Sequence, residues 1–148
     1  MKVNPIPDGF HTVTPYLVIE HAEKVIEFLK AAFNAELISS SKREDGGIMH
    51  ATVKIGNSMI MLAGATETYK SNPTMIYLYV EDTDAAYNAA MKAGATSIMA
   101  PVNQFYGDRN AGVKDIAGNQ WWIATHVENV SDEELKRRHD EYMSKQKA

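Results

Sequence analysis

The sequence has no cysteine, no long apolar run and no dense basic cluster, and each absence narrows what the chain can be. Without cysteine there are no disulfides, thiol nucleophiles or cysteine metal sites, which suits a reducing compartment. No segment is long enough to span a membrane, and the start, MKVNPIPDGFH, has prolines where a signal peptide needs an apolar run. The net charge of −4 argues against nucleic acid or an anionic membrane as a partner. We therefore predict a cytoplasmic protein with no nucleic-acid or membrane partner.

An internal repeat organises the middle of the chain. The 148 residues, 45% hydrophobic and 23% charged, fit one ordinary domain with a real core. Residues 18–38 (VIEHAEKVIEFLKAAFNAELI) and 79–99 (YVEDTDAAYNAAMKAGATSIM) align without a gap. Each segment reads as the end of a strand, an acidic turn, an amphipathic helix and the start of another strand.

Three short strand-like runs follow each helix. They are 36–42, 49–55 and 58–63 in the first half, and 97–104, 109–115 and 120–126 in the second. We therefore predict an α+β fold of two β-α-β-β-β units, at about 10–64 and 73–127, within a single domain at 1–130. A polar C-terminal helix at 131–148 begins with a capping box at Ser131 and Glu134, and it is either solvated or covers a pocket or partner.

Strand alternation then separates an inner from an outer face. In KDIAGNQWWIATH (114–126), neighbouring side chains point to opposite faces, so we expect Trp121 in the core and Trp122 on the other side. By the same reasoning, Val13, Pro15, Leu17 and Ile19 belong under the first helix. The other face collects aromatic residues and methionines, namely Tyr16, Met59, Met61, Met75, Tyr77, Tyr79 and Trp122. Such a face suits a pocket for a small planar or apolar molecule. It could equally pack on a second subunit or on the other half of the chain.

Two motifs carry a family resemblance. PYLVIEHAEKVIEFLKAAF near the start and YGDRNAGVKDIAGNQWWIATHVENVS near the end resemble the vicinal oxygen chelate superfamily, which includes glyoxalase I, extradiol dioxygenases and bleomycin resistance proteins. MHATVKIGNSMIML resembles its PhnB-like branch. The resemblance implies a cupped mixed sheet with helices on its outer face, a ligand in the cup, and a homodimer.

The resemblance also locates the positions where metal enzymes of this superfamily carry their ligands. Those positions are occupied here by Thr14, Met61, Met75 and Trp122, with Ile60 as an alternative to Met61. None of these side chains binds a hard or borderline divalent ion well. We therefore predict no metal site and no cofactor, and we expect Trp122 to line the cup.

A few polar residues remain as candidates for chemistry. His50 and His126 are weak catalytic candidates, because each shares a face with residues of the expected cup and could accept a proton near neutral pH. Asp108-Arg109, after Tyr106-Gly107, could place a guanidinium at the rim for a carboxylate or phosphate. Alternatively, Asp108 and Arg109 pair locally in a turn.

The leading hypothesis is a PhnB-like binding protein without demonstrable metal-dependent activity. Its ligand-binding residues would be Thr14, Tyr16, Met61, Met75, Tyr77, Tyr106, Arg109 and Trp122. The rival hypothesis is a glyoxalase-like lyase or isomerase, or a dioxygenase, that uses His50 or His126 as base or metal ligand. A third is a structural dimer whose cup is filled by its own side chains.

Overall fold

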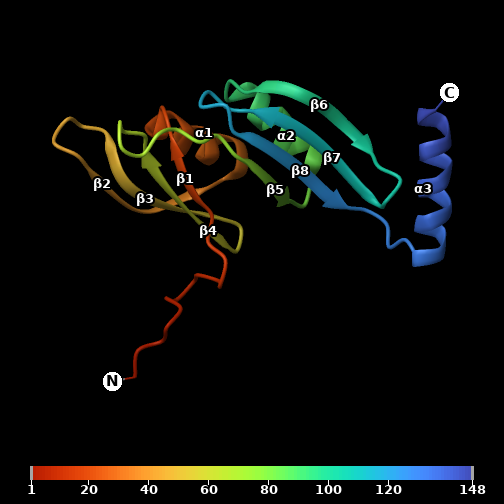
Figure 1. Ribbon diagram of the computed structural model, residues 1–148, viewed down its shortest axis with the longest axis horizontal. Helices are drawn as coiled ribbons and strands as arrows, with labels where there is room; N and C mark the ends of the chain where they lie inside the picture. Colours follow the sequence, from red (N-terminus) through yellow and green to blue (C-terminus); the bar gives the residue numbers. More distant parts are fainter. Residues whose placement is uncertain (1, 148) are drawn as a thin grey trace.

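The chain folds into two modules of the same topology, followed by a separate helix (Figure 1). The computed structural model describes residues 2–147, so the predicted limits at residues 1 and 148 lie outside the described residues. The first module comprises β1 (Tyr16–Ile19), α1 (Ala22–Phe33), β2 (Glu36–Lys42), β3 (Ile48–Ile55) and β4 (Ser58–Gly64). The second comprises β5 (Met75–Tyr79), α2 (Thr83–Lys92), β6 (Thr96–Asn103), β7 (Asp108–Lys114) and β8 (Gln120–His126). The last helix is α3 (Asp132–Gln146).

Each module contains one four-stranded mixed sheet. The strand orders, β1-β4-β3-β2 and β5-β8-β7-β6, correspond strand for strand, and in each sheet the first and last strands of the module pair in parallel. The registers also correspond, since Tyr16 lies opposite Met61 and Tyr77 lies opposite Trp122. The predicted α+β fold of two β-α-β-β-β units is confirmed.

The first strand is shorter than predicted. Strand β1 begins at Tyr16, and Val13, which we expected under the helix, is 80% exposed. Pro15 explains the difference, because proline has no N–H to donate to a strand ladder. Its carbonyl still accepts a hydrogen bond from the Met61 N–H, at 2.9 Å, and regular pairing starts at the next residue. The prediction for Val13 was therefore wrong, whereas Leu17 and Ile19 are buried as expected.

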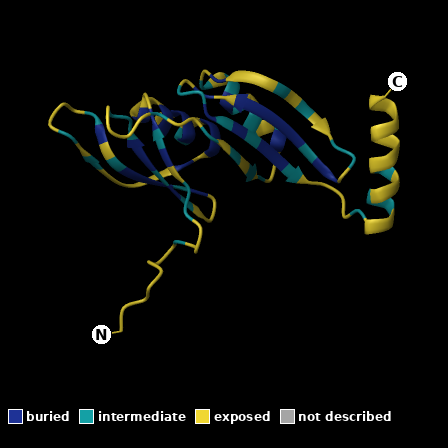
Figure 2. Cartoon of the chain, viewed as in Figure 1, coloured by how far each residue is buried: buried dark blue, intermediate teal, exposed yellow. Residues whose placement is uncertain are grey.

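One continuous core joins the two modules. Helix α1 packs on β3 and β4, helix α2 packs on β6, β7 and β8, and the two helices pack on each other. Figure 2 shows the resulting band of buried residues along the central strands. Across the junction, the ring centroids of Phe33 and Trp121 are 5.8 Å apart. Each sheet therefore has one face covered by helices and an opposite face, called here its open face.

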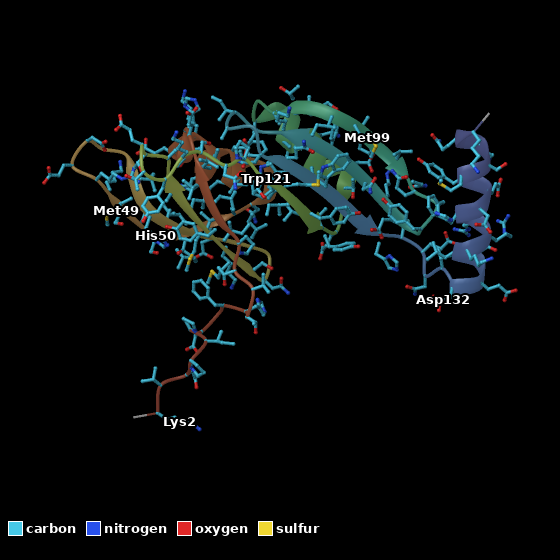
Figure 3. The ribbon with its side chains drawn as sticks, viewed as in Figure 1. Lys2, Met49, His50, Met99, Trp121 and Asp132 are labelled. Atoms are coloured by element: carbon cyan, nitrogen blue, oxygen red, sulfur yellow. The ribbon has the colours of Figure 1, made fainter. Side chains whose placement is uncertain are left out.

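Trp121 lies in this core, as predicted from strand alternation. It is fully buried, at the centre of the molecule in Figure 3. Its indole N–H donates to Oδ2 of the buried Asp115, at 2.8 Å. The same carboxylate accepts the backbone N–H groups of Ala117 and Asn119, and so closes the turn that precedes β8. A polar turn thus satisfies the only hydrogen-bond donor of the indole.

Helix α3 stands beyond the end of the second sheet, beside the β6–β7 hairpin (Figure 1). As predicted, Ser131 caps it, with its hydroxyl accepting the Glu134 N–H at 3.2 Å. Arg138 donates to the Phe105 carbonyl of the hairpin at 3.2 Å, and to the carboxylate of Glu128, between β8 and α3, at 2.7 and 2.8 Å. Within the described residues, no helix has the length and apolarity needed to cross a membrane.

Candidate functional site

The open face of the second sheet combines exposed aromatic rings with buried polar groups. Its side chains come from alternate positions of three adjacent strands. They are Met75, Tyr77 and Tyr79 on β5, Asp108, Asn110 and Gly112 on β7, and Trp122, Ala124 and His126 on β8.

The Asp108 carboxylate is the centre of a hydrogen-bond network on this face. Asp108 is only 5% exposed, and its Oδ2 accepts the hydroxyls of both Tyr77 and Tyr79, each at 3.0 Å. Its Oδ1 lies 2.9 Å from Nδ1 of His126. The other ring nitrogen of His126 lies 2.8 Å from Oδ1 of Asn129. One buried carboxylate therefore anchors three rings at their polar ends.

Asn110 extends the network to a third tyrosine. Its Nδ2 donates to the hydroxyls of Tyr77, at 3.2 Å, and Tyr106, at 2.8 Å. Its Oδ1 accepts from Nε2 of Gln104 at 2.9 Å. Both polar groups of the Asn110 amide are thus satisfied, and the network fixes Tyr106 next to Tyr77.

These hydrogen bonds determine the charge states. Burial alone would raise the pKa of Asp108, but hydrogen bonds from His126, Tyr79 and Tyr77 outweigh it and hold that pKa below its usual value. The bond to Asp108, followed by the bond to Asn129, raises the pKa of His126. Burial of the hydroxyl, together with the Asp108 carboxylate, raises the pKa of Tyr77 to about 12. The network thus favours a carboxylate, an imidazolium and neutral phenols.

Trp122 lies flat on the sheet because the residue opposite it is glycine. In the β7–β8 ladder Gly112 pairs with Trp122, and a Cβ on Gly112 would lie 2.9 Å from two atoms of the indole six-membered ring. Any larger residue at position 112 would therefore displace the ring. The indole N–H donates to Oε1 of Gln120 at 3.2 Å. Trp122 is half-buried and forms part of the floor of the open face.

A second glycine brings His126 and Asn129 into the network. Gly107 adopts φ +99°, and its carbonyl accepts the N–H groups of Val127 and Glu128 at 2.9 and 3.1 Å. A Cβ at this position would lie 2.3 Å from the Glu128 carbonyl oxygen. Only glycine fits, because both the backbone conformation and the close approach exclude a side chain.

A groove runs from this face to the first module. It has a volume of about 820 Å³, within the range of small-molecule pockets. Tyr77, Tyr79 and His126 line one side, and residues of the β3–β4 turn with Phe33 line the other. A ligand that lies between the two modules can therefore reach Tyr77, Tyr79 and His126 of the network.

The remaining predicted ligand-binding residues of the first half lie on the first sheet. Tyr16 faces Met61 across the ladder, and its ring centroid lies 5.8 Å from that of His50. Figure 3 shows His50 extending from this sheet. Thr14 precedes β1, with its hydroxyl 3.4 Å from the His11 carbonyl oxygen. His50 and His126 thus belong to different sheets, and the structure does not join them in one cluster.

Arg109 is separated from the other predicted ligand-binding residues. It alternates with Asp108 along β7, and its guanidinium binds Asp84 of α2 through Nε–Oδ2 at 2.6 Å and Nη2–Oδ1 at 2.8 Å. Nη1 donates to Asn103 at 3.2 Å. The alternative interpretation expected Asp108 and Arg109 to pair with each other in a turn. They do not pair, because their side chains point to opposite faces of the sheet.

Sequence reasoning did not identify Asp108, Asn110 or Gln104 as members of one network. The predicted strand 109–115 began one residue too late, which left Asp108 in a turn. Once β7 is extended to Asp108, alternation alone places Asp108 and Asn110 on the face of Trp122. The sequence signal that could have revealed the network was the spacing of Asp108 and Asn110, which lie two residues apart on one strand and so share a face.

No three His, Asp or Glu side chains of residues 2–147 are grouped so that they could hold a metal ion. The four positions aligned with the ligands of metal enzymes carry a hydroxyl, two thioethers and an indole. Met75 is two residues from Tyr77 on the same exposed face, and Trp122 lies over Gly112. This set of side chains does not fit a hard or borderline divalent ion.

Comparisons with known proteins agree with this architecture. Residues 9–123 match the family model described as Glyoxalase/Bleomycin resistance protein/Dioxygenase superfamily. "Uncharacterized protein Mb0911c" of Mycobacterium bovis is 32% identical over 147 residues, covering 92% of this chain and 94% of the relative. "Uncharacterized protein Rv0887c" of Mycobacterium tuberculosis is also 32% identical, covering 92% of this chain and 84% of the relative.

Solved structures share the fold. TioX from Micromonospora sp. ML1 superposes with a TM-score of 0.68 at 20% identity, covering 79% of this chain and 99% of that one. TnmS3, an antibiotic binding protein from Streptomyces sp. CB03234, superposes with a TM-score of 0.63 at 18% identity, covering 78% of this chain and 95% of that one. The chain belongs to the glyoxalase/bleomycin resistance protein/dioxygenase superfamily.

Proposed function

We propose that this protein binds a small, partly aromatic or apolar molecule on the open face of its second sheet, without a metal ion, as a PhnB-like member of the superfamily. The tyrosine network carries the proposal. The hydroxyls of Tyr77 and Tyr79 donate to Asp108, and the hydroxyl of Tyr106 accepts from Asn110, so much of the surface left for a ligand is ring. Fixed rings offer contact area at little cost in conformational entropy.

The likeness to TnmS3 supports a binding role. That protein is an antibiotic binding protein, so the shared fold can hold a small molecule. The donor set at the four ligand positions also favours binding without a metal, because neither thioether nor indole suits the divalent ions of metal enzymes. We expect elemental analysis after mild purification to find no stoichiometric Zn, Ni, Fe or Mn.

The test combines retained-ligand detection with a matched pair of variants. Native mass spectrometry of freshly purified protein identifies any bound molecule, and a thermal-shift screen of planar aromatic compounds finds surrogates. Trp122→Ala should weaken binding about three- to tenfold, since aromatic contacts contribute about 0.5–1.5 kcal/mol beyond area burial. Ile38→Ala, at an exposed apolar residue of the first sheet outside the predicted binding set, is the control. Equal losses in the two variants would contradict a site on the second sheet.

A second candidate function is catalysis of the glyoxalase or dioxygenase kind. The Asp108–His126 hydrogen bond favours it, because a carboxylate that orients a histidine is a common arrangement in acid–base catalysis. Here, however, the second ring nitrogen faces an amide oxygen, and the raised pKa favours imidazolium, which suits an acid better than a base. Turnover that survives removal of metal and is lost in His126→Gln would establish this candidate. His50 is tested by the same substitution.

We also propose that the protein forms a homodimer. Both open faces carry large exposed apolar side chains, including Tyr16, Met75 and Tyr77. A second subunit could cover these faces and complete the cup. Light scattering at micromolar concentration should give about twice the chain mass of 16.4 kDa. A monomer mass would contradict the dimer and leave the open faces exposed to solvent.

A further inference from the structure

A separate cavity lies on the first sheet, and the tyrosine network takes no part in it. Its volume is about 610 Å³. The lining residues are Tyr16, Val18, Arg43, Met49, Ala63, Gly64, Thr66, Thr68 and Tyr69. We call this cavity the Arg43 pocket. Its floor is formed by β1 and β4, and its sides are formed by the β2–β3 hairpin and the loop after β4.

Arg43 is held firmly in this pocket. It follows β2, and its backbone N–H donates to the Gly47 carbonyl at 2.8 Å, while its own carbonyl accepts the Gly46 N–H at 2.9 Å. The guanidinium Nη2 donates to the Gly64 carbonyl at 2.7 Å. These three hydrogen bonds fix both the backbone and the side chain of Arg43 next to the end of β4.

Arg43 differs from the other arginines in having no carboxylate partner. Among residues 2–147, Arg109, Arg137 and Arg138 each form an ion pair, whereas Arg43 binds a carbonyl and forms none. Asp45 lines a neighbouring cavity that Arg43 also borders, and its Oδ1 accepts the Gly47 N–H at 2.9 Å. A guanidinium carries five N–H donors, and the hydrogen bond to the Gly64 carbonyl uses one of those of Arg43.

The other polar groups of the pocket are also donors. Thr66 Oγ1 already accepts the Tyr69 N–H at 2.9 Å, which leaves the hydroxyl proton of Thr66 to donate outward. Thr68 adds a second hydroxyl, and no Asp or Glu lines the pocket. Elsewhere on this acidic chain, cavities include carboxylates, such as Glu23 and Glu27 beside α1. A lining with one cation, four hydroxyls (those of Thr66, Thr68, Tyr16 and Tyr69) and no acid fits an anion.

The walls fit an aromatic ring. Tyr16 and Tyr69 expose 52% and 70% of their surface, and Met49 adds a thioether. The loop that carries Tyr69 is fixed, because Thr66 donates its N–H to the Tyr69 carbonyl at 2.8 Å. Asn72 further anchors the loop to the Val18 carbonyl at 2.9 Å. The tyrosine wall thus stays beside the guanidinium.

We propose that the Arg43 pocket binds a small aromatic carboxylate, with Arg43 as the anion-binding residue. A planar carboxylate matches the fork of guanidinium N–H groups, and the tyrosines and methionine contact the ring. This site is distinct from the ligand face proposed for the second sheet and shares with the sequence-predicted binding set only Tyr16. It also assigns the anion-binding role predicted for Arg109 to an arginine that, within residues 2–147, forms no ion pair.

The test compares a carboxylate with its neutral isostere on the full-length protein. NMR titrations of ¹⁵N-labelled protein with 2-naphthoate and 2-naphthamide report both affinity and location. We expect 2-naphthoate to shift the amide signals of Gly64, Thr66 and Tyr69, and to bind about tenfold more tightly than 2-naphthamide, as expected for a hydrogen bond to a charged group. Shifts confined to Gly112 and Trp122 would overturn the Arg43 pocket while supporting the face on the second sheet.

Two substitutions of Arg43 separate charge from structure. Arg43→Gln should weaken 2-naphthoate about tenfold and leave 2-naphthamide unchanged, which also shows that the pocket is still folded. Arg43→Lys keeps the charge without the fork and should weaken 2-naphthoate less than Arg43→Gln does. Equal weakening of both probes in Arg43→Gln, or no weakening of 2-naphthoate in a variant that melts normally, would overturn the proposal.

Discussion

The two sheets of this protein share strand order and register but present different chemistry on their open faces. Tyr16 and Tyr77 occupy matching positions on the first strand of each module. Opposite them, however, the first sheet has Met61 and the second has Trp122. The repeat therefore preserves backbone geometry while the residues on the surface diverge, which is how one fold supports unrelated sites.

The strands next to Met61 and Trp122, β3 and β7, add to the chemical difference between the two open faces. Thr52 lies opposite Met61, whereas Gly112 lies opposite Trp122, so only the second sheet lets a large ring lie flat. Asp108 and Asn110 then cross-link the tyrosines of the second sheet. In the first sheet, Tyr16 meets the His50 ring without such a network. The second face is fixed by hydrogen bonds, and the first contains flexible methionines and an unpaired arginine.

The largest loss of stability should come from a substitution on the core side of the second sheet. Trp121→Ala removes a fully buried indole and leaves Asp115 without one of its donors. We expect a loss of about 3–5 kcal/mol in the free energy of unfolding, a large share of a domain's stability. Trp122→Ala should cost clearly less, because Trp122 is only half-buried. Urea unfolding of both variants is the measurement, and a larger loss for Trp122→Ala would reverse the assignment of faces.

The next effect tests why the two open faces differ. Gly112→Ala places a methyl group against the indole of Trp122, and we expect a loss of about 1–3 kcal/mol from overpacking. Thr52→Ala, at the equivalent position of the first sheet, removes atoms rather than adding them and serves as the control.

A double-mutant cycle sharpens this result. In the background of Trp122→Ala, the substitution Gly112→Ala should cost little, because the ring that it displaces is gone. Unfolding free energies of the four proteins give the coupling energy. Additive losses in the double variant would show that the strain does not come from the indole.

Much of the fold could be predicted from local patterns. The two strands 36–42 and 120–126 match the predicted limits, because turn signals bound them, EDGG after the first and AGN before the second. The assignment of Trp121 to the core follows from the same alternation. Val13 was misplaced because the effect of Pro15 on strand pairing was not considered.

The site was less predictable, because it depends on contacts between distant strands. The Asp108–Tyr79 hydrogen bond joins residues 29 positions apart, and the Asn110–Tyr77 bond joins residues 33 apart. No local pattern contains these pairs, and a shift of one residue in a strand limit moves Asp108 from the network to a turn. The binding roles of Thr14, Tyr16, Met61, Met75, Tyr77, Tyr106, Arg109 and Trp122 remain predictions.

A smaller effect should follow from removing the charge at the centre of the network. Asp108→Asn keeps the shape of the side chain but ends its ionic bond to His126, and we expect a loss of about 1–2 kcal/mol at pH 7. Burial, the largest cause of the raised pKa of Tyr77 (about 12), remains in this variant, so that pKa should fall only part of the way, by the contribution of the Asp108 carboxylate. Ultraviolet titration of tyrosinate measures this change. An unaltered titration curve would mean that Asp108 does not control Tyr77.

The smallest effect depends on pH and again compares the two sheets. The Asp108 carboxylate raises the pKa of His126 in the folded protein, so folding favours the protonated ring. The contribution of the Asp108–His126 bond to the free energy of unfolding is fully present below the unfolded histidine pKa, about 6.5, while Asp108 stays ionised. It is lost as the pH rises through the higher pKa of His126 in the folded protein. The stability difference between the native protein and His126→Gln should therefore be larger at pH 5.5 than at pH 8.5. His50→Gln is the matched substitution on the first sheet. Urea midpoints at both pH values decide the matter, because equal differences for His126→Gln would mean that the bond to Asp108 does not favour the imidazolium.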